Sequence, residues 1–176
     1  ITTYRRNAYI PFVFSTGQTD RLLVAVENRI RKNPRYFVTD YGRCIAIVLM
    51  ARCGLRIGEP LRLKLSDYDH RRRTIYIEKT KFSKDRLIPL PLTAAQQLDN
   101  YLAVRRSFVK ADNPYLVAGK SNVGLKDNFV RKGFYQAAAD IGCVQPKCFI
   151  ANTTFGRATC HSLRHSFAIN TLLMIK

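Results

Sequence analysis

The sequence has few acidic side chains for its length. Only 12 Asp and Glu residues stand against 30 Lys and Arg residues, which leaves a formal net charge of +18 on 176 residues. Solubility alone requires far less charge than this. A polyanionic partner is therefore expected, with DNA or RNA first and an anionic membrane second. No basic amphipathic helix with a broad aromatic face is evident, which argues against the membrane.

Several signals of other protein classes are missing too. No apolar run approaches the ~18 residues that a membrane-spanning helix needs. The five cysteines are irregularly spaced and form no C-x-x-C pair, so a zinc ribbon or a disulfide framework is not expected and a reducing, cytosolic setting fits best. There is no Walker loop and no G-x-G-x-x-G motif. Asp67, Asp69 and Asp85 are scattered among basic residues, which disfavours a metal-dependent nuclease.

Apolar residues make up 47% of the chain, enough for one folded domain with a real core. Residues 1–10 are polar and basic without a clear period and read as a linker or the remnant of an interdomain segment. Helical periodicity and helix-end signals mark the rest. They predict a first helix from the capping box Ser15–Gln18 to Pro34, a second over 39–53 with a stop at Gly54, and a short third through Leu61 and Leu65. A fourth helix is predicted from a second capping box at Thr93 to 109, and a fifth from a cap at Asp127 to Gly142. The last helix begins after a cap at Thr159, and its predicted buried residues are Phe167, Ala168, Ile169, Leu172 and Leu173.

Two strands are expected in the middle of the chain. Residues 74–78 alternate between apolar and polar side chains, and residues 86–90 read as the returning strand of a hairpin whose turn spans 82–85. Pro89 places the second strand near an edge. Residues 115–117 fit a short strand or a buried loop, and residues 143–157 are expected to be irregular.

The stretch from Cys160 to Phe167 concentrates cation-capable groups. In a helix, His161, Arg164 and His165 fall at i, i+3 and i+4 on one face. Such a face suits an anion, and a phosphate first of all. Zinc is disfavoured, because the glutamate of an H-E-x-x-H motif is missing and Arg164 lies beside the prospective ligands. For His165, a role in bracing the core by a hydrogen bond is an equal alternative.

Other basic residues have both a structural and a functional interpretation. Arg56 follows a helix stop and either forms a structural ion pair with Glu59 or belongs to a site. Lys81, entering the hairpin turn, is either solvated or a mobile ammonium that reaches a bound anion. The run Arg71, Arg72 and Arg73 is either a solvated turn or a contact to DNA phosphates.

Four segments of the sequence resemble the catalytic domain of the tyrosine recombinase (phage integrase) family, and they follow one another in the order found in that family. Residues 9–12 with the capped helix after them resemble the entry to the domain. Residues 51–59 resemble the box with the first catalytic arginine, residues 79–90 the hairpin with the catalytic lysine, and residues 161–165 the H-x-L-R-H box. The resemblance implies an α+β, mainly helical fold with a small antiparallel sheet that carries the lysine hairpin, and a catalytic domain over residues 11–176.

The resemblance also implies residue roles. Arg56, Lys81, His161 and Arg164 are expected to be catalytic, with Glu59 and His165 in support; Arg71, Arg72, Arg73 and Lys84 are expected to contact DNA phosphates. The activity implied is DNA strand cleavage and rejoining through a 3′-phosphotyrosyl intermediate. No metal or other cofactor is needed, because fixed cations supply the electrostatic stabilisation. Double-stranded DNA, self-association on DNA in the full-length protein and a cytoplasmic, nucleoid-associated location in a bacterial or phage setting are expected.

The chain departs from the family pattern in one respect. The family's nucleophilic tyrosine follows the H-x-L-R-H box, whereas Tyr101, Tyr115 and Tyr135 all precede it. The nucleophile is therefore expected to be absent from this chain, which reads as a catalytic domain without its C-terminal part that binds DNA but does not cut it alone. Two alternatives stay open: an integrase-derived DNA-binding regulator without chemistry, and a type IB topoisomerase, which the box spellings and the short hairpin disfavour.

Overall fold

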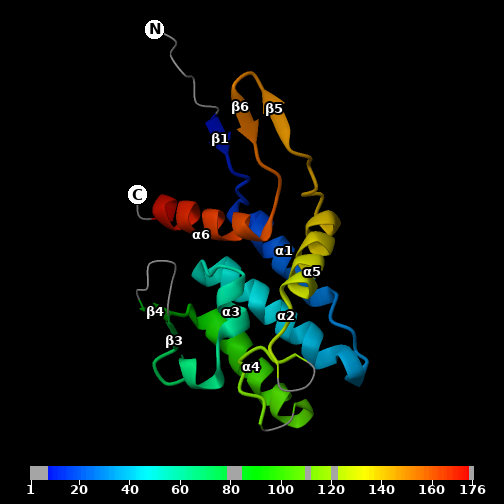
Figure 1. The fold of residues 1–176 in the computed structure, drawn as a ribbon, viewed down its shortest axis with the longest axis vertical. Coiled ribbons are helices and arrows are strands. Elements are labelled where there is room, and N and C mark those ends of the chain that lie inside the picture. The colour runs from blue at the N-terminus through cyan, green and yellow to red at the C-terminus, as the bar shows by residue number, and fades with distance from the viewer. Residues whose placement is uncertain (1–7, 79–84, 110–111, 120–122, 175–176) are drawn as a thin grey trace.

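The computed structural model describes residues 8–78, 85–109, 112–119 and 123–174. Helices form most of the body, and two small sheets lie at its margins (Figure 1). The α-helices are α1 (Thr16–Asn28), α2 (Pro34–Cys53), α3 (Gly58–Arg62), α4 (Leu92–Phe108), α5 (Asp127–Asp140) and α6 (Cys160–Met174). The strands are β1 (Ala8–Ile10), β2 (Tyr68–Asp69), β3 (Thr74–Ile77), β4 (Arg86–Pro89), β5 (Cys148–Ile150) and β6 (Thr153–Phe155), with a 3₁₀ turn, η1, at Leu65–Asp67. The mainly helical α+β expectation is confirmed.

Helix α2 is the centre of the fold. It packs against α1, α4, α5 and α6, and its residues from Gly42 to Ala51 are all buried (Figure 1). Because burial surrounds the helix on every side, its apolar residues do not form a single stripe. The predicted stop is confirmed, since Gly54 caps α2 in the left-handed conformation with φ 63°.

The first helix begins as predicted. The Gln18 N–H donates to Ser15 Oγ at 3.2 Å, and the Ser15 N–H donates to Gln18 Oε1 at 2.9 Å. The prediction that Pro34 ends a helix and that the next starts near 39 is wrong: Asn33 caps α2, and Pro34 is its first residue. Proline suits that position, because its missing N–H would have no partner in the first turn.

Two other cap assignments are also wrong. Helix α4 begins one residue before Thr93, with Pro91 at the cap position and its carbonyl accepting from the Ala95 N–H at 3.0 Å. Asp127 is the first residue of α5 rather than its cap, and its carboxylate pairs with Arg131 one turn on. An acidic residue in the first turn still suits the positive end of the helix dipole.

The predicted hairpin is confirmed by an antiparallel sheet of order β2-β3-β4, in which Ile77 faces Arg86. The predicted turn lies mostly outside the described residues. Strand β2, which the sequence did not indicate, extends the sheet. Residues 63–65 do not continue α3, because the helix ends at Arg62.

A second sheet has the order β1-β6-β5, with β1 parallel to β6 (Figure 1). Residues 143–157 were expected to be irregular, and that expectation is wrong because they contain β5 and β6. Residues 8–10, which show no periodic pattern, form β1. These strands are three residues long and mostly exposed, so the two-residue period cannot be read in them. The proposed domain boundary at residue 11 stays a prediction.

The start of α6 is confirmed, whereas the burial predicted for its second half is wrong, since none of Phe167, Ala168, Ile169, Leu172 and Leu173 is buried. Leu163 is fully buried, whereas Leu172 and Leu173 are 66% and 63% exposed. The second half of α6 therefore does not pack as the apolar sequence predicted, since no described element covers that face of it. Among the described helices, none is long and apolar enough to cross a membrane.

Candidate functional site

Arg56 lies between α2 and α3, and a buried carboxylate holds it. Glu59, 5% exposed, accepts the Arg56 main-chain N–H at 2.7 Å, and its Oε1 lies 3.3 Å from Arg56 Nη1. The ion pair that the sequence left open is therefore present. The Arg56 side chain remains 37% exposed, so a role in a site is compatible with the pair.

Arg86, the first residue of β4, shares the same carboxylate. Its Nη2 donates to Glu59 Oε2 at 2.7 Å. Glu59 thus ties the lysine hairpin to the arginine box, and its single negative charge faces two guanidiniums. The sequence did not single out Arg86; the available signal was an arginine that opens an otherwise apolar strand.

Arg164 arrives from α6. Its Nη1 donates to the carbonyl oxygen of Gly54, at the end of α2, at 2.7 Å. Burial, and then the charges of Arg56 and Arg86, lower the pKa of Arg164, while Glu59 opposes the shift. The three arginines therefore lie close enough to repel one another, with one carboxylate between them.

The two histidines of the H-x-L-R-H box flank this cluster. The rings of His161 and His165 meet edge to face, with centroids 4.5 Å apart. Burial lowers the pKa of His161 below its usual 6.5, and His165, Arg164 and Arg56 lower it further. His161 is therefore neutral at pH 7, so one ring nitrogen can accept a proton.

A shallow groove of about 430 Å³ opens beside the arginines. Its walls are the end of α2, strand β4 and helix α6, and its lining includes the side chains of Arg86 and Arg164. Since the surrounding guanidiniums outnumber the single carboxylate, the groove attracts an anion, and planar N–H forks suit phosphate oxygens. Among the described residues, no tyrosine lines the groove.

The predicted site residues are therefore only partly brought together. Arg56, Glu59, His161, Arg164 and His165 converge. Lys81 and Lys84 lie outside the described residues. The predicted phosphate contacts Arg71, Arg72 and Arg73 form the exposed turn between β2 and β3 and do not line the groove.

The Arg71–Arg73 turn is ordered by its own contacts. The Arg72 N–H donates to Asp69 Oδ1 at 2.9 Å, and Arg73 has a positive φ of 52°. The Arg72 side chain is 80% exposed, so its charge is available to solvent or to a polyanion. In the described part of the chain, no three His, Cys, Asp or Glu side chains gather as a metal site would require.

Comparison with known proteins gives a consistent result. The family model described as the phage integrase family matches residues 16–173. The protein y4rB of Sinorhizobium fredii, named as an integrase/recombinase, is 30% identical over 165 residues, which are 93% of this chain and 51% of y4rB. The tyrosine recombinase XerA of Pyrococcus furiosus is 28% identical over 167 residues, with 95% of this chain and 51% of XerA covered.

The fold has close counterparts among solved structures. The XerH site-specific recombinase bound to its difH substrate, in a pre-cleavage complex, superposes with a TM-score of 0.73 at 19% identity, covering 98% of this chain and 46% of XerH. The chain thus spans about half the length of the curated relatives that it matches.

Proposed function

Because this chain belongs to the phage integrase family, we propose that Arg56, Lys81, His161 and Arg164 are catalytic residues of a tyrosine-type, site-specific DNA recombinase. Double-stranded DNA is the proposed substrate. The XerH structure with a similar fold contains its DNA substrate, which supports this choice. The net charge of +18 supports it independently.

One observation carries the proposal: Arg56, Arg86 and Arg164 meet around the Glu59 carboxylate and the Gly54 carbonyl. When a phosphodiester is attacked, negative charge builds on its non-bridging oxygens. Guanidinium groups that are already held in place stabilise that charge without reorganising. By analogy with other oxyanion sites, each such donor contributes roughly 10²–10³ in rate.

In the proposed cleavage step, a tyrosine is the nucleophile and the residues assigned by the family resemblance handle the protons. A tyrosine oxygen attacks the phosphorus, the bond to the 5′ oxygen breaks, and a 3′-phosphotyrosyl bond forms. His161, neutral at pH 7, takes up the tyrosine proton or orients the phosphate. Lys81 delivers a proton to the leaving 5′ oxygen. The reverse sequence, with the 5′ oxygen of another strand as nucleophile, rejoins DNA.

Glu59 and His165 are proposed to position the catalytic groups. Glu59 holds two arginines, and His165 restrains the ring of His161. Arg71, Arg72, Arg73 and Lys84 are proposed to contact DNA phosphates outside the cleavage point. Strand exchange requires two duplexes, so we propose self-association on DNA. A cytoplasmic, nucleoid-associated location follows from a DNA substrate.

The test uses the protein as its gene encodes it and duplexes drawn from the sequence that flanks the gene. Each duplex carries 5′-bridging phosphorothiolates. Their thiolate leaving group departs without a proton and does not attack the phosphotyrosine in return, so the covalent complex accumulates. A denaturant-resistant protein–DNA complex is expected, and it should vanish in Arg164→Ala while persisting in Arg21→Ala, a change of an exposed arginine on α1. Because the thiolate needs no acid, Lys81→Ala should retain trapping. Binding to every duplex without trapping would favour the regulator instead.

A further inference from the structure

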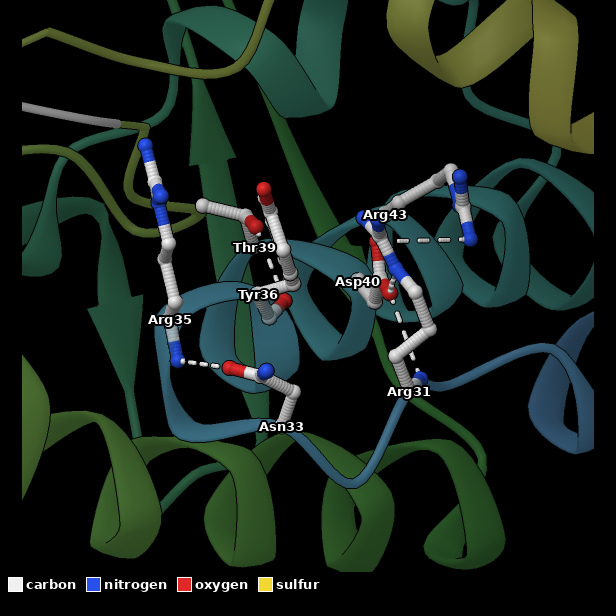
Figure 2. A network of polar contacts seen from close by, with 7 residues as sticks. All are labelled: Arg31, Asn33, Arg35, Tyr36, Thr39, Asp40 and Arg43. Atoms are coloured by element: carbon white, nitrogen blue, oxygen red, sulfur yellow. Dashed lines mark hydrogen bonds and ion pairs between the residues drawn. The ribbon is translucent and has the colours of Figure 1, made fainter.

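A second group of arginines surrounds a buried carboxylate near the start of α2. Asp40 is fully buried and faces Arg31 and Arg43 (Figure 2). Arg31 takes both carboxylate oxygens, with Nε 2.7 Å from Oδ2 and Nη2 3.0 Å from Oδ1, and its main-chain N–H adds a third contact at 3.2 Å. Arg31 therefore uses most of the hydrogen-bonding capacity of Asp40.

Arg43 has much weaker partners. Its side chain is 8% exposed, yet its contact to Asp40 Oδ1 is a long 3.5 Å. Within the described part of the chain, its Nε has no hydrogen-bond partner. Buried polar groups are normally hydrogen-bonded, and an exception points to an unseen water, ion or ligand. Burial lowers the pKa of Arg43 although Asp40 opposes the shift, so its charge is incompletely compensated.

The packing around Arg43 keeps its side chain in one place. On α5, Gly133 leaves room for it: a Cβ there would lie 2.4 Å from Arg43 Cδ. The Phe129 ring covers the guanidinium, with its centroid 4.6 Å from Cζ. The guanidinium is thus preorganised, which reduces the entropy cost of binding an acceptor.

A cavity of about 540 Å³ adjoins this guanidinium. Arg29, Arg31, Arg43 and Lys132 line it together with Asn28 and Gln136. Two carboxylates lie nearby, and each is already paired: Asp140 with Arg29 at 2.5 Å, and Asp40 with Arg31. Each of the two carboxylates offsets one arginine, so two of the four cationic side chains that line the cavity remain uncompensated, and the cavity is positive.

We propose that this cavity is a second anion site, distinct from the groove, and that it binds a phosphate group. A tetrahedral oxyanion has several acceptor oxygens, so it can accept hydrogen bonds at once from Arg43 on α2, Lys132 on α5 and Arg31 between α1 and α2. Arg43 lies about 16 Å along α2 from Gly54, at 1.5 Å per residue, so a phosphate in the groove does not fill this cavity. The site stands independently of the recombinase proposal.

The test follows the Arg43 Nε–H signal by NMR while inorganic phosphate is titrated into the 176-residue chain. An Arg164→Ala background weakens anion binding in the groove, and Arg43→Lys identifies the signal. Phosphate should shift this signal. Lys132→Ala, at an exposed position, should weaken the phosphate affinity by roughly fivefold, the upper range for an exposed ion pair. The matched change Lys147→Ala, outside the cavity, should leave it unaltered.

A signal that stays in place up to tens of millimolar phosphate would overturn the site, as would equal affinities in the two lysine variants. If Arg43→Lys does not fold, the comparison of Lys132→Ala with Lys147→Ala still decides. A second arm adds a short DNA duplex to the phosphate-loaded protein. Displacement of phosphate by the duplex identifies a backbone phosphate as the source, and retention identifies a small phosphate compound.

Discussion

Arg164 Nη1 donates to the carbonyl oxygen of Gly54 across 110 positions of sequence. The bond joins the first half of α6 to the C-terminal end of α2, where the helix dipole is negative and favours a cation. It fixes one edge of the guanidinium of Arg164, whose side chain also lines the groove. The end of the central helix therefore positions a proposed catalytic residue.

Gly54 should tolerate no side chain. Its φ of 63° costs a non-glycine residue about 1–2 kcal/mol, and a Cβ would lie 2.5 Å from Phe167 Cδ1. Gly54→Ala should therefore destabilise the fold more than Gly142→Ala, where φ is 73° but no atom lies within 4 Å. Urea unfolding measures both. Adding Phe167→Leu to Gly54→Ala should recover part of the difference; equal losses at the two glycines would contradict the contact.

Arg86 should contribute one phosphate contact. Arg86→Ala is expected to lower the slope of log affinity against log salt by about one, because each neutralised phosphate of duplex DNA contributes about 0.9. The measurement is duplex binding by fluorescence anisotropy between low and moderate salt. Arg86→Lys keeps the charge and should keep the slope. If Arg86→Ala binds with the wild-type slope, Arg86 only anchors the hairpin through Glu59.

His161 should make the fold less stable in acid. Its pKa in the folded protein lies below the 6.5 of the unfolded chain, so the unfolded state binds the extra proton first. The contribution of His161 to stability is therefore complete above pH 6.5 and is lost as pH falls toward its folded pKa. Urea unfolding from pH 7.5 down to 5 should show a smaller loss in His161→Gln. A variant with the wild-type pH dependence would refute the shift.

Asp40 should be costly to neutralise. Asp40→Asn removes the carboxylate that faces the buried Arg43 and is expected to cost about 3–5 kcal/mol, as for other broken buried pairs. The matched change is Asp140→Asn, which breaks the surface pair with Arg29 and should cost below about 1 kcal/mol. Equilibrium unfolding in urea distinguishes them. Similar small losses in both would show that Asp40 does not compensate Arg43.

Local signals in the sequence predicted local structure well. The Ser15–Gln18 box, the stop at Gly54 and the β3–β4 strands each depend on neighbours a few positions away, so their patterns are readable. Thr93 shows the limit of such signals. A capping pattern occurs there, but Pro91 starts the helix earlier, and the side chain is left within the first turn.

The short strands show a different limit. Three residues are too few to display a period, and β1 is ordered by pairing with β6, about 145 positions further along. Arg86 illustrates the same limit in the site. Its sequence context indicates only a strand, and its importance appears when Glu59 is found to hold it beside Arg56.

The sequence by itself determined the helix that presents His161, Arg164 and His165 on one face, because helical geometry relates residues three and four apart. It also determined the basic charge and the family resemblance. Only the tertiary structure decided that Arg86 and Arg164 line one groove, with Arg56 held beside Arg86 by Glu59, and that Arg43 is buried without adequate partners. Those outcomes depend on how α5, α6 and β4 pack around α2 and α3, and packing between distant segments leaves no periodic pattern in the chain.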